Sequence, residues 1–322
     1  PDGVLKLDST TLRKLPWEKG IELYLGDFSE DPLLNAVCPR SLLKRIQAQA
    51  DEAGYQAKFG AEFEWFMFHK NSEDTSANNY QNMTPISSGM FGYSMLRTSQ
   101  FQELTHRFLS DLTAAKLPLE GLHTETGPGV YEAAISYCDA LEMADQSSLF
   151  KLGVKQIANE CDVMASFMAK WSPLYPGCSG HLHQSLWDEK GQNMFYSSDN
   201  EFGLSTVAQQ YLAGQLYCLP FILPMFAPTV NSYRRYVAGS WAPTTLSWGV
   251  DNRTTAIRVV PEMSGGRHLE HRVSGADINP YLAISACLAS GLYGIKNKLP
   301  LTIAPCHGNA YEQAKLSKLP GS

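Results

Sequence analysis

Two glutamates lie two residues apart inside an aromatic run, and this feature constrains the fold more than any other. The run FGAEFEWFMF covers residues 59–68, and its part Ala61–Phe68 predicts a β-strand because it alternates in its first half and is aromatic throughout. Successive side chains of a strand point to opposite faces, so Glu62 and Glu64 share one face. Like charges held this close repel unless a cation lies between them. A solvent-exposed strand face remains the alternative.

A second pair of carboxylates flanks a predicted turn. Residues 123–132 read HTETGPGVYE, in which Glu125 and Glu132 bracket Gly-Pro-Gly. Such a turn folds the chain back, so the two carboxylates can converge. An ordinary hairpin with exposed acids would carry the same sequence.

Histidines and one further glutamate occur on two other predicted strands. His181 and His183 share a face of the segment HLHQSLW, which suits metal or phosphate contact, although such a pair is often structural. Glu270 and Arg272 lie two apart in HLEHR. Five carboxylates with one or two imidazoles favour Mg²⁺ or Mn²⁺ over Zn²⁺, and no cysteine pair has ligand spacing. The sequence therefore predicts a divalent-cation site.

Arginines gather in one part of this acidic chain. Arg234, Arg235, Arg253, Arg258 and Arg272 fall within a 39-residue window, whereas Lys and Arg together number only 26 against 32 Asp and Glu. Guanidinium groups grip phosphates and carboxylates bidentately. Surface salt bridging is the plain alternative, but metal ions with several arginines suit phosphoryl transfer. Neither a Walker A sequence nor the protein-kinase motifs occur, so a nucleotide site would be of another type.

The order of predicted elements favours an α+β fold with a largely antiparallel sheet, because strands and helices do not alternate strictly. Helices are expected over residues 40–53, 99–115, 146–161, 203–217 and 279–297, with a capping box at Ser99–Gln102. Strands are expected over 61–68, 130–137, 181–187, 244–250, 255–260 and 268–273. The polar segment 72–92 is expected to be a long surface loop.

Composition excludes several classes of protein. The net charge of −6 leaves no basic footprint for nucleic acid. The longest apolar run, residues 216–227, is broken by Pro220 and Pro224 and is too short to span a membrane. Seven cysteines without a CxxC pair predict free thiols and hence a cytoplasmic location.

Over essentially its whole length the sequence resembles the glutamine synthetase family. The matching stretches are FGAEFEWFMF, ETGPGVYE, GCSGHLHQSL, PTVNSYRRYV, WGVDNRTTAIRV, HLEHR and ADINPYLAISACLASGLYGIKNKL. The resemblance implies a catalytic domain whose strands form a funnel with two divalent metals at its waist. It also implies a two-step reaction in which ATP phosphorylates the γ-carboxylate of glutamate and an amine then displaces the phosphate.

The resemblance also implies roles for particular residues. Glu64, Glu125 and Glu132 match the ligands of the metal nearer glutamate, and Glu62, His181 and Glu270 match the ligands of the metal at the ATP phosphates. Arg235 matches the arginine for the glutamate α-carboxylate, Arg253 and Arg258 match phosphate contacts, and Arg272 faces the transferred phosphoryl group. Gly177 belongs to a loop that contacts glutamate, His183 is on the phosphate side, and Tyr137 and Ser185 are on the nucleotide side.

Three positions depart from the family pattern and concern the substrate pocket. Trp241 stands where the flap of glutamine synthetases has a glutamate that helps to deprotonate ammonium. An indole cannot accept that proton, although its face can hold a cation. Pro176 replaces an asparagine that contacts glutamate, and Gly265 stands near the usual place of a nucleotide-side lysine.

Residues 1–322 are accordingly expected to be one catalytic domain, without the preceding β-grasp domain and part of the C-terminal tail. In the family that domain completes the active site of a neighbouring subunit, so the full protein is expected to be a ring-forming homo-oligomer. We expect an ATP-dependent ligase joining glutamate to an organic amine or polyamine, as in γ-glutamylpolyamine synthetases. Glutamine synthetase using ammonia is one alternative, and a non-catalytic relative such as the lens protein lengsin is another.

Overall fold

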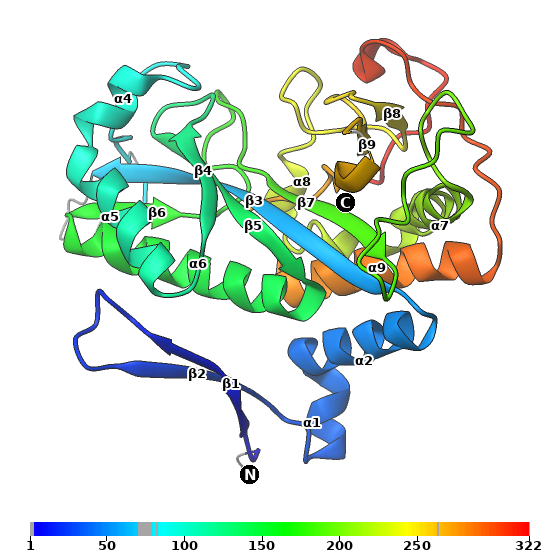
Figure 1. Cartoon of the computed structure of the whole chain (residues 1–322). Coiled ribbons are helices and arrows are strands. Elements are labelled where there is room, and N and C mark those ends of the chain that lie inside the picture. The colour runs from blue at the N-terminus through cyan, green and yellow to red at the C-terminus, as the bar shows by residue number, and fades with distance from the viewer. Residues whose placement is uncertain (1–2, 70–78, 82, 263, 322) are drawn as a thin grey trace.

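A long central strand, β3 (Gln56–His69), organises the structure, a computed structural model that describes residues 3–69, 79–81, 83–262 and 264–321 (Figure 1). It belongs to an eight-stranded sheet in the order β4-β5-β3-β7-β10-β9-β8, with β6 pairing separately to β3. The other strands are β4 (Leu119–Thr124), β5 (Val130–Asp139), β6 (Val163–Ser166), β7 (Gly180–Trp187), β8 (Trp248–Val250), β9 (Ile257–Val260) and β10 (His268–His271). Only the β8–β9 pair is parallel among these described strands, which confirms the predicted α+β fold with a largely antiparallel sheet.

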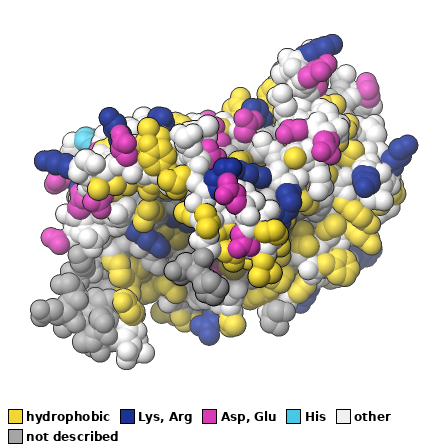
Figure 2. All heavy atoms as spheres, turned by 90° about the horizontal axis from the view of Figure 1, so that it is seen from below, with side chains coloured by type: hydrophobic (Ala, Val, Ile, Leu, Met, Phe, Trp, Pro, Cys, Tyr) yellow, Lys and Arg dark blue, Asp and Glu magenta, His cyan; other side chains and the backbone are white. Residues whose placement is uncertain are grey.

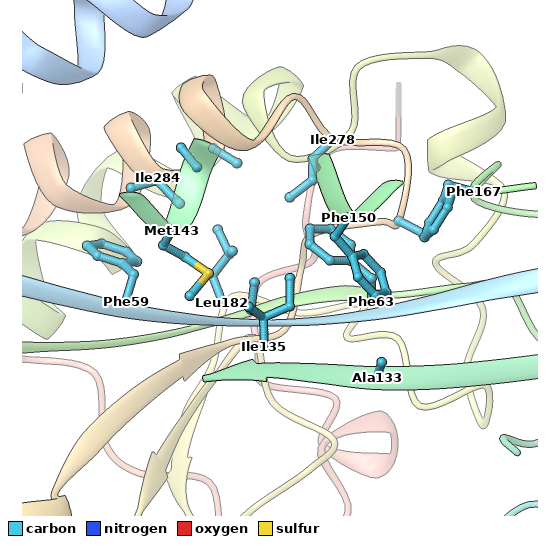
Figure 3. Close-up of a cluster of buried hydrophobic side chains, with 14 of the residues drawn as sticks. Phe59, Phe63, Ala133, Ile135, Met143, Phe150, Phe167, Leu182, Ile278 and Ile284 are labelled. Atoms are coloured by element: carbon cyan, nitrogen blue, oxygen red, sulfur yellow. The ribbon is translucent and has the colours of Figure 1, made fainter. Parts of the chain in front are cut away.

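Helices cover one face of this sheet. α6 (Ala140–Glu160) and α9 (Pro280–Lys296) lie beneath it in Figure 1. Figure 3 shows Phe59 and Phe63 of β3 pointing toward the side of Met143 and Phe150 of α6. All four side chains are almost fully buried. Because alternate residues of a strand face opposite ways, this packing directs Glu62 and Glu64 to the uncovered face.

The remaining helices flank the sheet or follow its strands. They are α1 (Pro32–Val37), α2 (Pro39–Glu52), α4 (Met95–Gln100), α5 (Gln102–Ala114), α7 (Thr206–Ile222) and α8 (Val230–Tyr233). Two predicted helix caps are confirmed. The Asn279 side chain accepts hydrogen bonds from the amides of Tyr281 and Leu282 at the start of α9. Gly54 follows α2 with a φ of 83°, the left-handed conformation that ends many helices.

The predicted capping box at Ser99 is wrong. Ser94 caps α4, Phe101 separates α4 from α5, and the Ser99 hydroxyl donates to the carbonyl of Met95. The hydroxyl is therefore bonded one turn back inside α4 and cannot cap α5.

A separate two-stranded sheet precedes the main body. It consists of β1 (Lys6–Lys14) and β2 (Glu22–Asp27), which lie below the helices in Figure 1. The buried Arg40 of α2 joins it to the body, since its guanidinium donates to Asp8 and Asp27 of the small sheet and to Asp145 of α6 at 2.9–3.2 Å. Burial of so many charges is tolerated because each is paired.

The structure also bears on the expected loop, the cysteines and the side chains at the surface. Residues 72–78 and 82 of the expected loop lie outside the described residues, and the described remainder up to Gly92 forms an isolated bridge, Pro85 with Phe68, but no helix or strand. All seven cysteines are free thiols. Acidic and basic side chains are interspersed with apolar ones on the face seen in Figure 2. No helix within the described ranges is long and apolar enough to cross a membrane.

Candidate metal and phosphate site

Strand register brings the predicted ligands together. Glu62 of β3 pairs with His181 of β7, and Glu64 pairs with Glu132 of β5. On the other side of β7, Glu270 of β10 pairs with His183. Directly opposed residues on neighbouring strands have Cβ atoms about 4.5–5.5 Å apart. The uncovered face of the sheet therefore carries a row of acids and imidazoles across four strands.

One group of side chains has the geometry of a cation site. Glu62, His181 and Glu270 each offer a ligand atom within 4.8 Å of the others. His181 Nδ1 lies 3.5 Å from a Glu62 oxygen and 3.4 Å from a Glu270 oxygen, while its buried Nε2 has no hydrogen-bond partner. Two carboxylates and an imidazole fit a divalent cation with mainly oxygen ligands.

A second group lies on β4, β5 and the turn between them. His123, Glu125 and Glu132 offer ligand atoms within 4.8 Å of one another, and His123 Nε2 is 3.5 Å from a Glu132 oxygen. Glu64 lies on the neighbouring strand and accepts a hydrogen bond from the Ser179 amide at 2.9 Å. The predicted ligands Glu125 and Glu132 are thus close together, whereas the third member of this tight group is His123. Glu64 as a metal ligand stays a prediction.

The second group carries more negative charge than its surroundings balance. Burial, followed by the charges of Glu64 and other nearby carboxylates, raises the pKa of Glu132 to about 10. Burial also raises the pKa of Glu64 to about 7; the Ser179 amide opposes this rise and the charge of Glu125 adds to it. A bound cation would reverse both shifts, so these carboxylates suit a metal ion.

The first group is already compensated. Burial disfavours the charge of Glu270, but Arg272 and the two histidines outweigh it and lower the pKa of Glu270 to about 2. Burial and the charge of Arg272 lower the pKa of His181 to about 4, so its imidazole is neutral and can act as a ligand.

Two of the predicted arginines lie directly beside a carboxylate of the site. Arg272 donates to Glu270, and Arg258 donates to the other Glu270 oxygen at 3.0 Å. Arg272 also donates to the carbonyl of Arg253 at 2.9 Å. Two guanidinium groups are therefore bonded to Glu270 at one end of the carboxylate row, and the backbone of Arg253 helps to hold Arg272 there.

One cavity of about 360 Å³ joins these groups. All six predicted metal ligands line it, as do Arg253, Arg258, Arg272, Gly177 and Trp241. A neighbouring cavity of about 560 Å³ shares Glu62 and Arg258 with it and is lined by the predicted nucleotide-side residues Tyr137, His183 and Ser185. The two cavities thus meet at the first group of ligands.

Aromatic and imidazole rings shape the larger cavity. Tyr137 stacks on Trp187 with 6.5 Å between ring centroids, and the Trp187 indole donates to the Ser185 hydroxyl. His268 Nδ1 lies 2.6 Å from the carbonyl of Gly266 and must donate to it, so its Nε2 accepts from His183 Nδ1 at 3.0 Å. This chain of bonds directs His183 Nε2 toward Glu62, 3.2 Å away.

Arg235 lies behind the cavity surface. It is only 1% exposed, and its guanidinium donates to the Ser179 hydroxyl and to the carbonyls of Arg272 and Val273. Gly177 packs against it, because a Cβ there would lie 2.3 Å from the carbonyl oxygen of Ala169 and 2.9 Å from Arg235. In this conformation Arg235 supports the wall, and its contact with glutamate stays a prediction.

Trp241 is at the boundary of the site. It is 55% exposed, has a φ of 62°, and its carbonyl faces Arg272 at 3.5 Å. The loop is further fixed by the Tyr311 hydroxyl, which donates to the carbonyl of Ala242 at 2.9 Å. Trp241 therefore lies at the edge of the cavity, and its standing in place of a carboxylate stays a prediction.

Two cavity residues were not assigned roles from the sequence. His123 lies in the second ligand group, and Tyr93 stacks on it with 4.4 Å between centroids. Burial and the carboxylates of Glu125 and Glu132 raise the pKa of Tyr93. His123 had a usable signal, because it precedes Glu125 by two residues on one strand face, whereas Tyr93 follows a turn-rich loop without any pattern.

Several known proteins are similar in sequence to this chain. Residues 36–322 match the family model described as "Glutamine synthetase, catalytic domain". The chain is 46% identical to Type-1 glutamine synthetase 2 of Dictyostelium discoideum, covering all of this chain and 62% of that protein. It is 39% identical to Gamma-glutamylethanolamide synthetase GlnA4 of Streptomyces coelicolor, covering 96% of this chain and 66% of that protein. A glutamate–isopropylamine ligase of a Pseudomonas species is 37% identical, with coverages of 97% and 68%.

Solved structures give the same result. A GmaS–ADP complex superposes with a TM-score of 0.88 at 28% identity, covering 98% of this chain and 73% of that one. GmaS without ligand gives a TM-score of 0.87 at 27% identity. The chain spans about three fifths to two thirds of the length of the curated relatives named above.

Proposed function

The chain belongs to the glutamine synthetase family, and on that premise we propose that it is the catalytic part of an ATP-dependent ligase that joins the γ-carboxylate of glutamate to an organic amine. The observation that carries the proposal is the single cavity in which six metal-ligand side chains, three arginines and Trp241 meet. Like-charged carboxylates crowded at one place have a physical reason to persist if they bind cations.

The residues divide the work of the reaction. In the first step an oxygen of the γ-carboxylate attacks the γ-phosphorus of ATP and ADP leaves. In the second, the nitrogen of the neutral amine attacks the acyl carbon, phosphate leaves, and the proton that the nitrogen loses goes with the departing phosphate. Glu62, His181 and Glu270 would hold one divalent ion, and Glu64, Glu125 and Glu132 would hold the other. Such ions, when bound, neutralise phosphate charge and keep the reacting oxygens in line.

The positive side chains act on the transferred group. Arg272 is the nearest guanidinium to Glu270, so we assign it to the phosphoryl group during transfer, with Arg253 and Arg258 beside it. Tyr137, Ser185 and His183 line the neighbouring cavity and are assigned to ATP. Gly177 and Arg235, which pack against each other, are assigned to the glutamate side.

Trp241 supports an organic acceptor. Ammonia and alkylamines both arrive as cations that must lose a proton; ammonia has no apolar part and depends on a carboxylate to bind it, whereas an alkylamine also has a carbon chain that can pack against an indole. Trp241 offers only an apolar face and one N–H donor. Relatives named for ethanolamide and isopropylamine products agree with this acceptor class, whereas the 46% identity to a protein named glutamine synthetase favours ammonia as the second candidate.

The experiment is a comparison of acceptors. Full-length protein with ATP, glutamate and Mg²⁺ is given ammonia, alkyl amines or diamines, and phosphate release is measured. We expect an organic amine to give the highest kcat/KM and Trp241→Glu to shift preference toward ammonia. Highest kcat/KM with ammonia in the unmutated protein would establish the second candidate instead, and no phosphate release with any acceptor would indicate a non-catalytic relative.

A further inference from the structure

A third cavity adjoins the 360 Å³ cavity that holds the predicted metal ligands, which we call the metal-site cavity. Its volume is about 700 Å³, and Trp241 and Arg253 line both cavities. Its other walls come from Val250 and Asp251 at the end of β8 and from His307 and Tyr311 near the C-terminus. We call it the tail cavity. A molecule whose reacting atom lies in the metal-site cavity could extend into it past the indole.

The walls of the tail cavity are held by its polar groups. The Asn252 amide donates to the carbonyls of Cys306 and Gly308 at 3.0 and 2.7 Å. The Thr254 hydroxyl donates to Asn252 Oδ1 and accepts from the Ala310 amide at 2.9 Å. These bonds join residues 250–254 to residues 306–311, so the cavity is built by tertiary contacts.

The charges of this cavity disfavour a cationic occupant. Asp251 is its acidic lining residue, and it already binds Arg258, whose Nε lies 3.0 Å from Asp251 Oδ1. Arg253 also lines this cavity and brings a positive charge to its wall. A distal ammonium would meet this positive charge, and the charge of the Asp251 carboxylate is already paired with Arg258. The indole of Trp241, 55% exposed, and the side chain of Val250, 37% exposed, provide apolar surface instead.

We infer that the tail cavity binds the carbon chain of the acceptor and that the acceptor is a primary amine with an uncharged alkyl tail. This inference rests on the proposed function and narrows it. Each methylene that enters the cavity leaves water, whereas a diamine or polyamine would bring a charge beside Arg253. Trp241 then has two parts in specificity: it removes the carboxylate that ammonia needs, and it forms one wall for the tail.

The test compares acceptors that differ in one property. Full-length protein is assayed with methylamine, butylamine and 1,4-diaminobutane, the last two having the same four-carbon chain. Three additional buried methylenes raise kcat/KM for butylamine over methylamine by up to about 50-fold. Butylamine should also exceed 1,4-diaminobutane. A preference for the diamine, or no gain with chain length, would overturn the inference while leaving the ligase activity established.

Two variants locate the effect in the cavity. Val250→Trp and His307→Trp fill it from different elements, and each should lower the ratio of kcat/KM for butylamine over methylamine by at least about 10-fold. Val230→Trp, at an 80% exposed position of α8, is the matched control and should leave the ratio unchanged. An unchanged ratio in a folded Val250→Trp or His307→Trp variant would overturn the assignment.

A binding measurement separates this inference from the proposed function. Calorimetry with γ-glutamylbutylamide and γ-glutamylmethylamide reports the cavity without turnover. His307→Trp should weaken binding of the butylamide more than of the methylamide. If the unmutated protein releases no phosphate with any acceptor yet shows this difference, the proposed function fails and the tail cavity stands. If both amides weaken equally, the tail cavity is refuted.

Discussion

Binding of a divalent cation should release protons, and the number of protons can be worked from the structure. The perturbation is a titration of the metal-free protein with Mn²⁺ at pH 7. A carboxylate must lose its proton to become a ligand. With a pKa of about 10, Glu132 is protonated at pH 7, and with a pKa of about 7, Glu64 is about half protonated. The coupled site should therefore release between one and two protons, about 1.5, as the ion binds.

The assay is calorimetry in two buffers of different ionisation enthalpy at the same pH, which yields the number of protons released. Because binding releases protons, log Kd should fall as pH rises from 6 to 8, and the magnitude of the slope at each pH should equal the number released there. Glu132→Gln has no proton to lose, so its release should fall by about one proton. Release near zero in the unmutated protein, with no change in Glu132→Gln, would refute the raised pKa values and the ligand assignment.

The same shift makes stability depend on pH with a definite sign. Between the ordinary value of 4.5 and about 10, folded Glu132 holds a proton that the unfolded chain has lost. The free energy of unfolding of the metal-free protein should therefore fall as pH rises, by about 1.4 kcal/mol per pH unit for one proton. Glu132→Gln should remove this part of the slope, which urea unfolding at pH 6, 7 and 8 measures.

Other predictions test the arginines and the nucleotide side. Arg272→Ala should lower turnover by at least ~10²-fold in phosphate-release assays, since it removes a donor to the transition-state charge. Arg234→Ala, at an exposed position, is the control. Equal turnover in the two variants would exclude Arg272 from the chemistry. Arg40→Ala leaves three aspartates without their buried partner and should lower the free energy of unfolding by about 3–5 kcal/mol. Arg45→Ala, at an exposed position, should lower it by less than about 0.5 kcal/mol. In the unmutated protein Asp8 has its pKa lowered to about 2, chiefly by the Thr10 hydroxyl, with burial opposing and Arg40 assisting, so its stabilisation is present above pH 3.8 and should be lost as pH falls toward 2. Tyr137→Ala should raise KM for ATP more than it lowers kcat if Tyr137 only binds the nucleotide; a fall in kcat alone would contradict that role.

The face that carries chemistry could be predicted because strand periodicity is strict. Knowing that Glu62 and Glu64 alternate with Phe63 and Trp65 is enough to put the acids on one face and the rings on the other, and the buried rings confirm it. Which acids would be neighbours across strands depends on register, and register follows from long-range pairing that no local pattern reveals. The pairing of Glu62 with His181 and of Glu64 with Glu132 therefore came from the structure.

Local sequence signals did not predict the start of helix α6 or the presence of strand β4. α6 begins at Ala140, six residues before the predicted start, because β5 passes directly into the helix at Asp139, which makes no side-chain cap bond. β4 was missed as a strand, although it carries His123; its short polar sequence LEGLHT has a glycine in the middle and is held by pairing with β5. Such elements are defined by their neighbours more than by their own residues.

The distribution of charge over the two ligand groups bears on whether this protein is a non-catalytic relative. Around Glu270 the guanidinium groups of Arg258 and Arg272 already balance the charge, so that part of the site could persist as an internal ion-pair network with no metal. Around Glu132 the described neighbours include His123 but also Glu64 and Glu125, and burial keeps the pKa of Glu132 far above its ordinary value. A purely structural protein would be more stable with glutamine or an apolar residue there, because a buried acid that resists ionisation contributes nothing that a neutral side chain could not. The second group, more than the first, is therefore the part of this chain whose charge favours a bound cation.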